Sequence, residues 1–163
     1  MDTSSLPFLG FKLPIISTEQ MIEVDRLMVE QYGITLFQMM EHAGLNLARL
    51  ALTLSETKNR FLILAGSGGN GGGALVAARR LIGWGLKVVI RTSKSFDQYH
   101  GVPAHQLYIL KQLNADIKPF DPTEKLAADV ILDGIIGYSI NGNPLGIAAQ
   151  MIESINRLKT NTI

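Results

Sequence analysis

The sequence of 163 residues predicts an α/β fold in which helices cover both faces of a mainly parallel sheet. Short, wholly aliphatic runs alternate with helical patterns, and strands buried on both faces of a parallel sheet have this composition. Two glycine-containing stretches follow two of the aliphatic runs, at residues 66–73 and 134–144. Because ligands bind at the carboxyl ends of the strands in such sheets, both stretches fall where a site is expected.

The N-terminal part of the chain is expected to contain an irregular arm, residues 1–16, followed by one domain over residues 17–163. Ser17 and Gln20 match a capping box, in which each residue bonds the backbone of the other. Apolar residues follow at three- and four-residue spacing until Gly33, which predicts a helix that ends there.

The remaining elements follow from the same signals. Thr35 and Gln38 repeat the capping pattern and predict a second helix. Pro103 suits the first position of a helix, and Asn114 is a plausible stop. We expect strands at residues 61–65, 86–90, 115–120 and 128–133, and further helices at 72–82, 103–113 and 145–158. The alternation then predicts another strand where the chain ends at Ile163, so we expect this sequence to be part of a longer domain.

Composition narrows the range of functions. The formal net charge of +1 gives no overall field that would attract nucleic acid or an anionic membrane. The absence of cysteine excludes disulfides, thiol nucleophiles and cysteine metal ligands. No apolar run is long enough to cross a bilayer, and the N-terminus does not resemble a secretory signal. We therefore expect a cytoplasmic protein without membrane or nucleic-acid partners.

The first glycine stretch, residues 66–73, reads Gly-Ser-Gly-Gly-Asn-Gly-Gly-Gly between a predicted strand and a predicted helix. Backbone amides at such a helix N-terminus can bind phosphate. The stretch satisfies G-x-G-x-x-G, but Arg91 and Thr92 stand where an acid would hold a ribose hydroxyl. Gly72 and Gly73 replace the Lys and Ser/Thr of a P-loop. The alternative is a merely tight strand-to-helix turn.

Asn70 and Asp133 are the candidate polar groups of the two stretches. Asn70 carries the only side-chain amide in the first stretch. It could contact a ligand or simply adopt a left-handed turn conformation, and the sequence does not favour one over the other. Asp133 ends an aliphatic strand, so it is a candidate general base or cation ligand, or else a cap for the next loop. The three histidines show no zinc-binding spacing. Five nearby cations could form a basic rim near this stretch, although solvated surface charge is the default interpretation: Arg79, Arg80, Lys87, Arg91 and Lys94.

Three segments together resemble the YjeF N-terminal domain family, the NAD(P)H-hydrate epimerases: residues 17–33, 66–79 and 133–137. The family has a Rossmann-like, three-layer αβα fold with a mainly parallel sheet. It interconverts the R and S epimers of hydrated NADH and NADPH, so that an ADP- or ATP-dependent dehydratase can restore the cofactor. The resemblance implies an epimerase that forms a homodimer and works with a fused or separate dehydratase.

The resemblance also implies a substrate site made from both glycine stretches. The implied substrate-binding residues are Gly68, Gly69, Asn70, Gly71, Gly72, Gly73, Gly137, Tyr138, Ser139, Ile140, Asn141, Gly142 and Asn143. Asn70 and Asp133 are implied to hold K⁺, and Asp133 is the candidate catalytic residue. The family loop usually reads G-x-G-N-N-G-G-D-G, whereas this chain has Gly69 and Gly73 at the first Asn and the Asp.

The family continues into a further strand and a D-x-P-S-G-L-D segment, which would begin where this chain ends. We therefore expect the domain to be incomplete at its C-terminal end. Epimerisation of hydrated NADH and NADPH is the leading hypothesis. The alternative is a non-catalytic nucleotide-binding or scaffold module derived from the same fold, which Gly69 and Gly73 favour. An ordinary dinucleotide-dependent oxidoreductase is a distant third interpretation.

Overall fold

A computed structural model describes residues 15–55, 60–138, 140–158 and 161–163 of the chain. The chain consists of two compact units, of which the first ends at Ile34 and the second runs from Thr35 to Ile163. The first contains helix α1 (Thr18–Glu30). Within the described ranges, no helix combines the length and hydropathy needed to span a bilayer.

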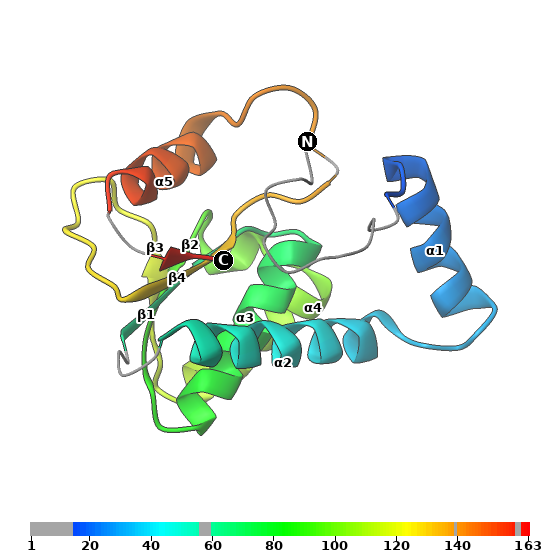
Figure 1. Cartoon of the computed structure of the whole chain (residues 1–163), viewed down its shortest axis with the longest axis horizontal. Helices are drawn as coiled ribbons and strands as arrows, with labels where there is room; N and C mark the ends of the chain where they lie inside the picture. Colours follow the sequence, from blue (N-terminus) through cyan, green and yellow to red (C-terminus); the bar gives the residue numbers. More distant parts are fainter. Residues whose placement is uncertain (1–14, 56–59, 139, 159–160) are drawn as a thin grey trace. The chain divides into compact units, whose positions relative to one another are not determined.

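The second unit holds all the strands among the described residues (Figure 1). Its elements in chain order are α2 (Leu36–Ser55), β1 (Arg60–Ala65), α3 (Gly69–Gly83), β2 (Lys87–Thr92), the 3₁₀ turn η2 (Phe96–Gln98), α4 (Gly101–Gln112), β3 (Asp116–Pro119), β4 (Val130–Gly134), α5 (Gly146–Asn156) and β5 (Asn161–Thr162).

Both predicted capping patterns are confirmed. The Ser17 amide donates to Gln20 Oε1 at 2.7 Å, and the Gln20 amide donates to Ser17 Oγ at 3.2 Å. The Thr35 amide donates to Gln38 Oε1 at 2.8 Å, and the reciprocal bond to Thr35 Oγ1 is 3.3 Å. These bonds satisfy backbone donors that a helix N-terminus otherwise leaves without partners. After α1, Gly33 adopts the left-handed φ of 67° that ends the helical path.

The strands form one parallel sheet in the order β3-β2-β1-β4-β5. Strands β2 and β3 are therefore added on one side of β1, and β4 and β5 are added on its other side. The crevice between β1 and β4 is the topological switch point, where sheets of this kind bind ligands. Ala65 at the end of β1 lies beside Thr92 of β2 and Gly134 of β4, so three strands end level at this crevice.

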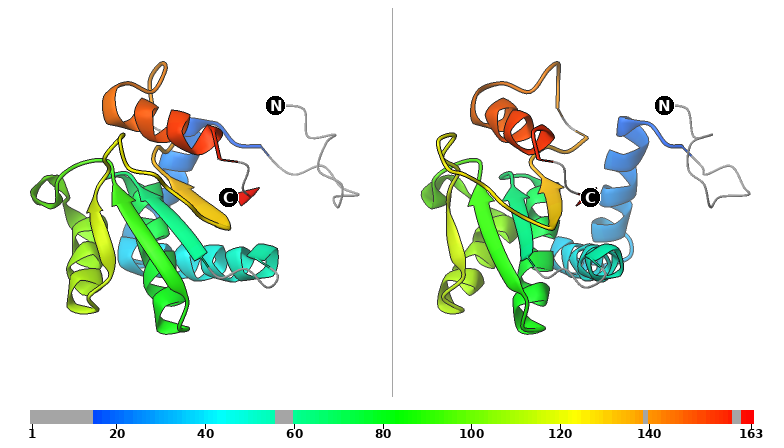
Figure 2. Two further views of the ribbon diagram at one scale, coloured as in Figure 1. Left: turned by 90° about the vertical axis from the view of Figure 1, so that its left-hand side faces the viewer. Right: turned by 60° about the vertical axis from the view of Figure 1, so that its left-hand side comes forward.

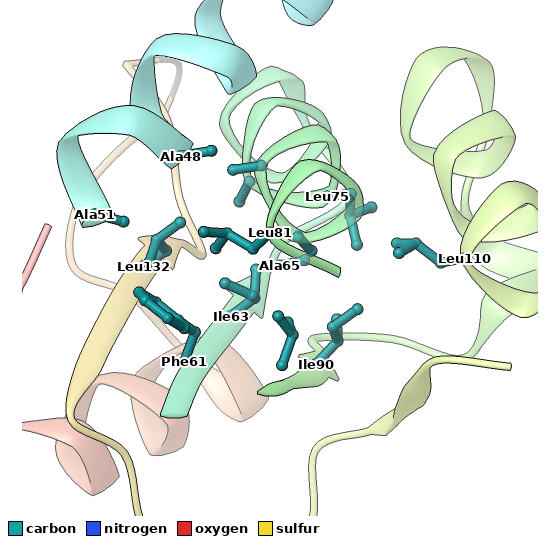
Figure 3. Close-up of a cluster of buried hydrophobic side chains, with 14 of the residues drawn as sticks. Ala48, Ala51, Phe61, Ile63, Ala65, Leu75, Leu81, Ile90, Leu110 and Leu132 are labelled. Atoms are coloured by element: carbon teal, nitrogen blue, oxygen red, sulfur yellow. The ribbon is translucent and has the colours of Figure 1, made fainter. Parts of the chain in front are cut away.

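Helices α2, α3 and α4 cover one face of the sheet and α5 covers the other (Figures 1 and 2). Alternate residues of a strand point to opposite faces. Phe61 and Ile63 of β1 accordingly join the cluster under α2, α3 and α4 (Figure 3), whereas Leu62 and Leu64 pack with Met151 of α5. Burial on both faces explains why the central runs of β1, β2 and β4 are apolar, and the three-layer α/β prediction is confirmed.

Helix α3 begins at Gly69, three residues earlier than the sequence predicted. The residues from Gly69 to Gly73 therefore lie in its first turns and not in an open loop. A Cβ at Gly71 would lie 1.8 Å from the carbonyl oxygen of Gly66. A side chain at Gly71 would therefore prevent the helix from beginning so close to the end of β1. The prediction treated the glycines as loop formers because it lacked this packing constraint.

The boundaries of α4 and β2 also differ from prediction. Helix α4 begins at Gly101 with His100 as its N-cap, so Pro103 occupies the third position, where its missing N–H still costs no helical bond. Strand β2 continues through Arg91 and Thr92, two residues beyond the aliphatic run. Polar residues can extend the strand there because Arg91 finds charged partners.

Arg91 is a nearly buried cation, with only 4% of its side chain exposed. Its guanidinium donates two bonds of 2.7 Å to the Glu124 carboxylate and one of 2.9 Å to Asp116. The hydrogen bonds from Arg91 lower the pKa of Glu124 to about 2, against the opposing effect of burial and with help from Lys118. This ion pair attaches the segment after β3 to the sheet.

We predict that Glu124→Gln lowers the free energy of unfolding by about 2 kcal/mol at pH 7, because Arg91 loses a charged, bidentate partner. The pKa of Glu124 is lowered from 4.5 to about 2 by folding, so its stabilising contribution is complete above pH 4.5 and is lost as the pH falls towards 2. Urea unfolding across this range should show the difference between wild type and variant shrinking with acid.

Glu153→Gln is the matched control. The Glu153 side chain is 67% exposed and lies 3.9 Å from Arg157, so its loss should change stability by less than about 0.5 kcal/mol. Equal losses in the two variants, or a Glu124 effect that does not depend on pH, would contradict the structural role given to Arg91.

Candidate functional site

The two glycine stretches meet backbone to backbone at the switch point between β1 and β4. The Gly66 amide donates to the Gly134 carbonyl at 2.9 Å. A Cβ at Gly66 would lie 2.0 Å from the carbonyl oxygen of Ile135, and one at Gly134 would lie 2.6 Å from Ala74 Cβ. Real side chains do not tolerate such distances, so glycine is required at these positions. The two stretches are therefore parts of one site.

Asn70 connects the stretches through its side chain. Its Nδ2 donates to the carbonyl of Ile136 at 2.9 Å. Asn70 lies in the first turn of α3, and Asn114 is the only non-glycine among the described residues with a positive φ. The alternative of an asparagine in a left-handed turn is therefore wrong. In the part of the chain that the structure describes, no hydrogen bond engages Asn70 Oδ1, which leaves an acceptor available to a ligand.

Asp133 is exposed at the end of β4, and its Oδ1 accepts the Ile135 amide at 3.0 Å. This bond is the loop-capping role that the sequence left open, and it also fixes the carboxylate. Asp133 and Asn70 line the same cavity of about 160 Å³. The cavity is completed by Gly69 and Gly73 of α3 and by Met40, Ala43 and Leu47 of α2.

A second cavity, of about 320 Å³, lies over the joined glycine turns. Asn70 lines this cavity as well as the one that contains Asp133. The implied substrate-binding residues Gly68, Asn70, Gly71, Gly137 and Ile140 all line it. The structure therefore brings together residues from both glycine stretches, separated by about 70 positions in sequence, as the switch-point topology requires.

The other implied substrate-binding residues lie elsewhere. Gly72 is buried against α4, where a Cβ would lie 3.3 Å from Pro103 Cγ. Tyr138 is 50% exposed. Asn141, Gly142 and Asn143 lie on the exposed part of the loop before α5, and Ser139 lies outside the described residues.

The five cations grouped as surface charge divide into different environments. Arg79 and Arg80 both pair with Glu41 of α2. Burial raises the pKa of Glu41, but the two arginines outweigh this effect and lower the pKa below its usual value. Arg91 is the nearly buried cation of β2. Lys94 alone of the five lines the cavity over the glycine turns.

Sequence reasoning missed the contribution of α2 to the site. Met40, Ala43 and Leu47 lie on a stripe with three- and four-residue spacing, a pattern that by itself indicates one packed helix face. The fully buried apolar residues of α2 are Ala48 and Ala51, and Leu47 packs against the same cluster while only partly buried. Ala48 and Ala51 form a second apolar stripe beside the first one. This second stripe was the signal in the sequence that α2 has more apolar surface than core packing alone requires.

The strand order and the glycine turn at the switch point define a Rossmann-like α/β domain. The chain belongs to the YjeF-related protein N-terminus family, whose model matches residues 36–163.

Three named relatives show how far the similarity extends. A Dehalogenimonas lykanthroporepellens protein named NAD(P)H-hydrate epimerase is 45% identical over 151 residues, covering 90% of this chain and 61% of that protein. An Entamoeba histolytica protein of the same name is 32% identical, and the match covers 88% of this chain and 64% of that protein. A Hyperthermus butylicus protein named bifunctional NAD(P)H-hydrate repair enzyme Nnr is 32% identical, with 78% of this chain and 25% of that protein covered. This chain therefore spans less than two thirds of the length of these relatives.

The crystal structure of yeast ynu0 has the same fold. It superposes with a TM-score of 0.73 at 24% sequence identity, covering 92% of this chain and 69% of the yeast chain.

We predict opposite effects for two alanine substitutions in α3. Gly71→Ala should lower the free energy of unfolding by at least about 2 kcal/mol, because its Cβ would lie 1.8 Å from the Gly66 carbonyl oxygen. Gly73→Ala should raise it by about 0.5 kcal/mol or more, because its Cβ would meet no atom within 4 Å and alanine favours the helix. Urea unfolding of both variants is the measurement; destabilisation by Gly73→Ala that matches Gly71→Ala would contradict the close approach.

Proposed function

We propose that this protein is an NAD(P)H-hydrate epimerase, which interconverts the R and S epimers of hydrated NADH and NADPH. Membership of the family and the names of relatives up to 45% identical support the activity. The observation that carries the proposal is the junction of the two glycine stretches, fastened by the Asn70 to Ile136 hydrogen bond. Such a junction offers backbone amides and one oriented carboxylate within adjoining cavities.

The backbone would bind the phosphates of the substrate. The N-terminus of α3 begins at Gly69 with glycines, so backbone N–H groups can approach an anion closely. The turn after β4, including Gly137, would contact the adjoining ribose. Such contacts hold the substrate in one orientation and thereby lower the entropic part of the barrier.

Asp133 would move a proton at the hydrated nicotinamide ring. Its Oδ1 is oriented by the Ile135 amide at 3.0 Å, which leaves Oδ2 to meet a substrate group in the cavity that it shares with Asn70. A carboxylate held in this way can act as a general base. A positioned general base typically contributes a factor of about 10² to 10⁴ to a rate.

The same cavity suits K⁺. Asn70 offers an amide oxygen and Asp133 a carboxylate oxygen, and hard cations prefer such oxygen donors. A bound K⁺ would supply positive charge that neutralises the substrate's phosphates or a developing negative charge. In this role Asp133 would hold the cation instead of moving the proton, and the two roles give different results in the experiments below.

The proposed domain extends over residues 17–163, and its proposed location is the cytoplasm. An ADP- or ATP-dependent dehydratase, fused or separate, would consume one of the epimers. The bifunctional name of the Hyperthermus butylicus relative supports such a partnership. We also propose that the protein forms a homodimer.

A non-catalytic nucleotide-binding module is the second candidate. Gly69 and Gly73 favour it, because both line the Asp133 cavity and neither supplies a side chain there. A Cβ at either position would meet no atom within 4 Å, so the fold itself does not require these two glycines. Nucleotide binding without epimerisation would support this candidate.

We predict that Asp133→Asn lowers the rate of epimerisation of hydrated NADPH by about 100-fold or more, because the amide cannot accept the proton. The measurement follows the approach of a pure R epimer to the equilibrium mixture by chromatography. Glu153→Gln, an exposed acid on α5, should leave the rate unchanged. Full activity in Asp133→Asn would remove this residue from the chemistry.

We predict that replacing K⁺ by tetramethylammonium at constant ionic strength lowers the melting temperature by a few degrees, because a ligand that binds the folded state stabilises it. Asp133→Ala should abolish the difference between the two salts. A wild-type melting temperature that is the same in both salts would contradict the cation site, and it would leave the proton-transfer role of Asp133 in place.

A further inference from the structure

A third cavity continues the site along the ends of β2 and β3. It has a volume of about 530 Å³. It shares Ser93, Lys94 and Ala148 with the cavity over the glycine turns. The two cavities therefore adjoin, and the loop that follows β2 forms the boundary between them.

Hydrogen bonds to the sheet hold this loop in place. The Ser93 amide donates to the Ala65 carbonyl at 2.9 Å, which extends the pairing of β1 and β2 beyond their ends. Thr92 Oγ1 donates to the Lys94 carbonyl at 2.8 Å. The buried Tyr99 hydroxyl donates to the same Ala65 carbonyl at 2.7 Å and supports the loop from below. The backbone of Lys94 is thus fixed at the boundary.

Lys94 is the only charged residue lining either of these two cavities in the described part of the chain. Its neighbour Arg91 is paired with Asp116 and Glu124, so its charge is compensated. None of the ion pairs among the described residues involves Lys94. Ser93 and Ser95, its two neighbours in sequence, also line the cavity.

We propose that Lys94, with Ser93 and Ser95, binds the 2′-phosphate of an adenosine ribose, so that the site prefers the phosphorylated coenzyme hydrate. This inference rests on the proposed function and names its favoured substrate. In Rossmann-like sheets, the ribose that follows the glycine turn lies against the end of β2. An acid there accepts a bond from a free 2′-hydroxyl and repels phosphate, whereas a cation accommodates the 2′-phosphate.

The absence of an acid after β2 is consistent with binding of a 2′-phosphate at this position. By sequence alone, Arg91 and Thr92 at that position weigh against a dinucleotide site. In the structure both are buried, and the first residue beyond them with a charged, accessible side chain is Lys94. A free 2′-hydroxyl finds no carboxylate among the residues that line this cavity, while a phosphate finds the ammonium group of Lys94.

Calorimetric binding of three probes tests the assignment directly: adenosine 2′,5′-bisphosphate, adenosine 3′,5′-bisphosphate and adenosine 5′-monophosphate. The first two have the same charge, so a difference between them reports the position of the second phosphate. We expect the wild type to bind the 2′,5′ probe roughly tenfold more tightly than the other two. Lys94→Ala should remove that preference. Lys87→Ala, at the opposite end of β2, should retain it.

Three outcomes would overturn the inference. One is no preference for the 2′,5′ probe in the wild type, or no binding of any probe. Another is equal weakening of all probes by Lys94→Ala, which would place Lys94 against the 5′-phosphate. The last is loss of the preference in Lys87→Ala, which would indicate a general charge effect.

Epimerisation kinetics separate this inference from the function on which it rests. For an active enzyme, Lys94→Ala should lower kcat/KM for hydrated NADPH roughly tenfold and that for hydrated NADH less than twofold. Activity with an unchanged ratio of the two substrates would overturn the 2′-phosphate site alone. A wild type that prefers the 2′,5′ probe and epimerises neither substrate would overturn the proposed function and retain the binding site.

Discussion

The close approach between the end of β1 and the turn after β4 determines how the rest of the site is arranged. Gly66 and Gly134 touch through their backbones, and the first turn of α3 packs onto Gly66 through Gly71. No side chain fits between these segments, so their spacing is fixed by main-chain atoms. Because the backbones are this close, the short Asn70 side chain can reach the Ile136 carbonyl and connect the two turns.

The polar groups around this junction are few and well separated. Asn70 lies between two cavities: one contains Asp133, and the other contains Lys94. An elongated ligand with a 2′-phosphate near one end, a diphosphate in the middle and a reactive ring at the other end would match a cation on one side of the junction and a carboxylate on the other. The proposed substrate has this form, and the proposed epimerase and 2′-phosphate assignments use opposite ends of the same site.

The sequence predicted the class of fold because burial on both sheet faces leaves a strong signal, as in the runs containing Phe61 to Ala65 and Val130 to Leu132. The helix cap was equally predictable, since the reciprocal bonds of Ser17 and Gln20 span only three positions of sequence. The predicted start of α3 was wrong because glycine favours loops locally. The close contact between Gly71 and Gly66 explains why a glycine-rich helix begins there. The α2 contribution and the place of Lys94 depend on packing between distant elements, which local patterns do not encode.

The most direct measurement of the central claim is a titration of ¹⁵N-labelled protein with hydrated NADPH in K⁺ buffer, followed by backbone amide chemical shifts. If both turns form one nucleotide site, amides of Gly68 to Gly71 and of Ile135 to Gly137 should shift together, with one common dissociation constant. Amides around Ser93 should follow the same curve. Shifts confined to one turn, separate dissociation constants for the two turns, or no shifts at all would contradict the account.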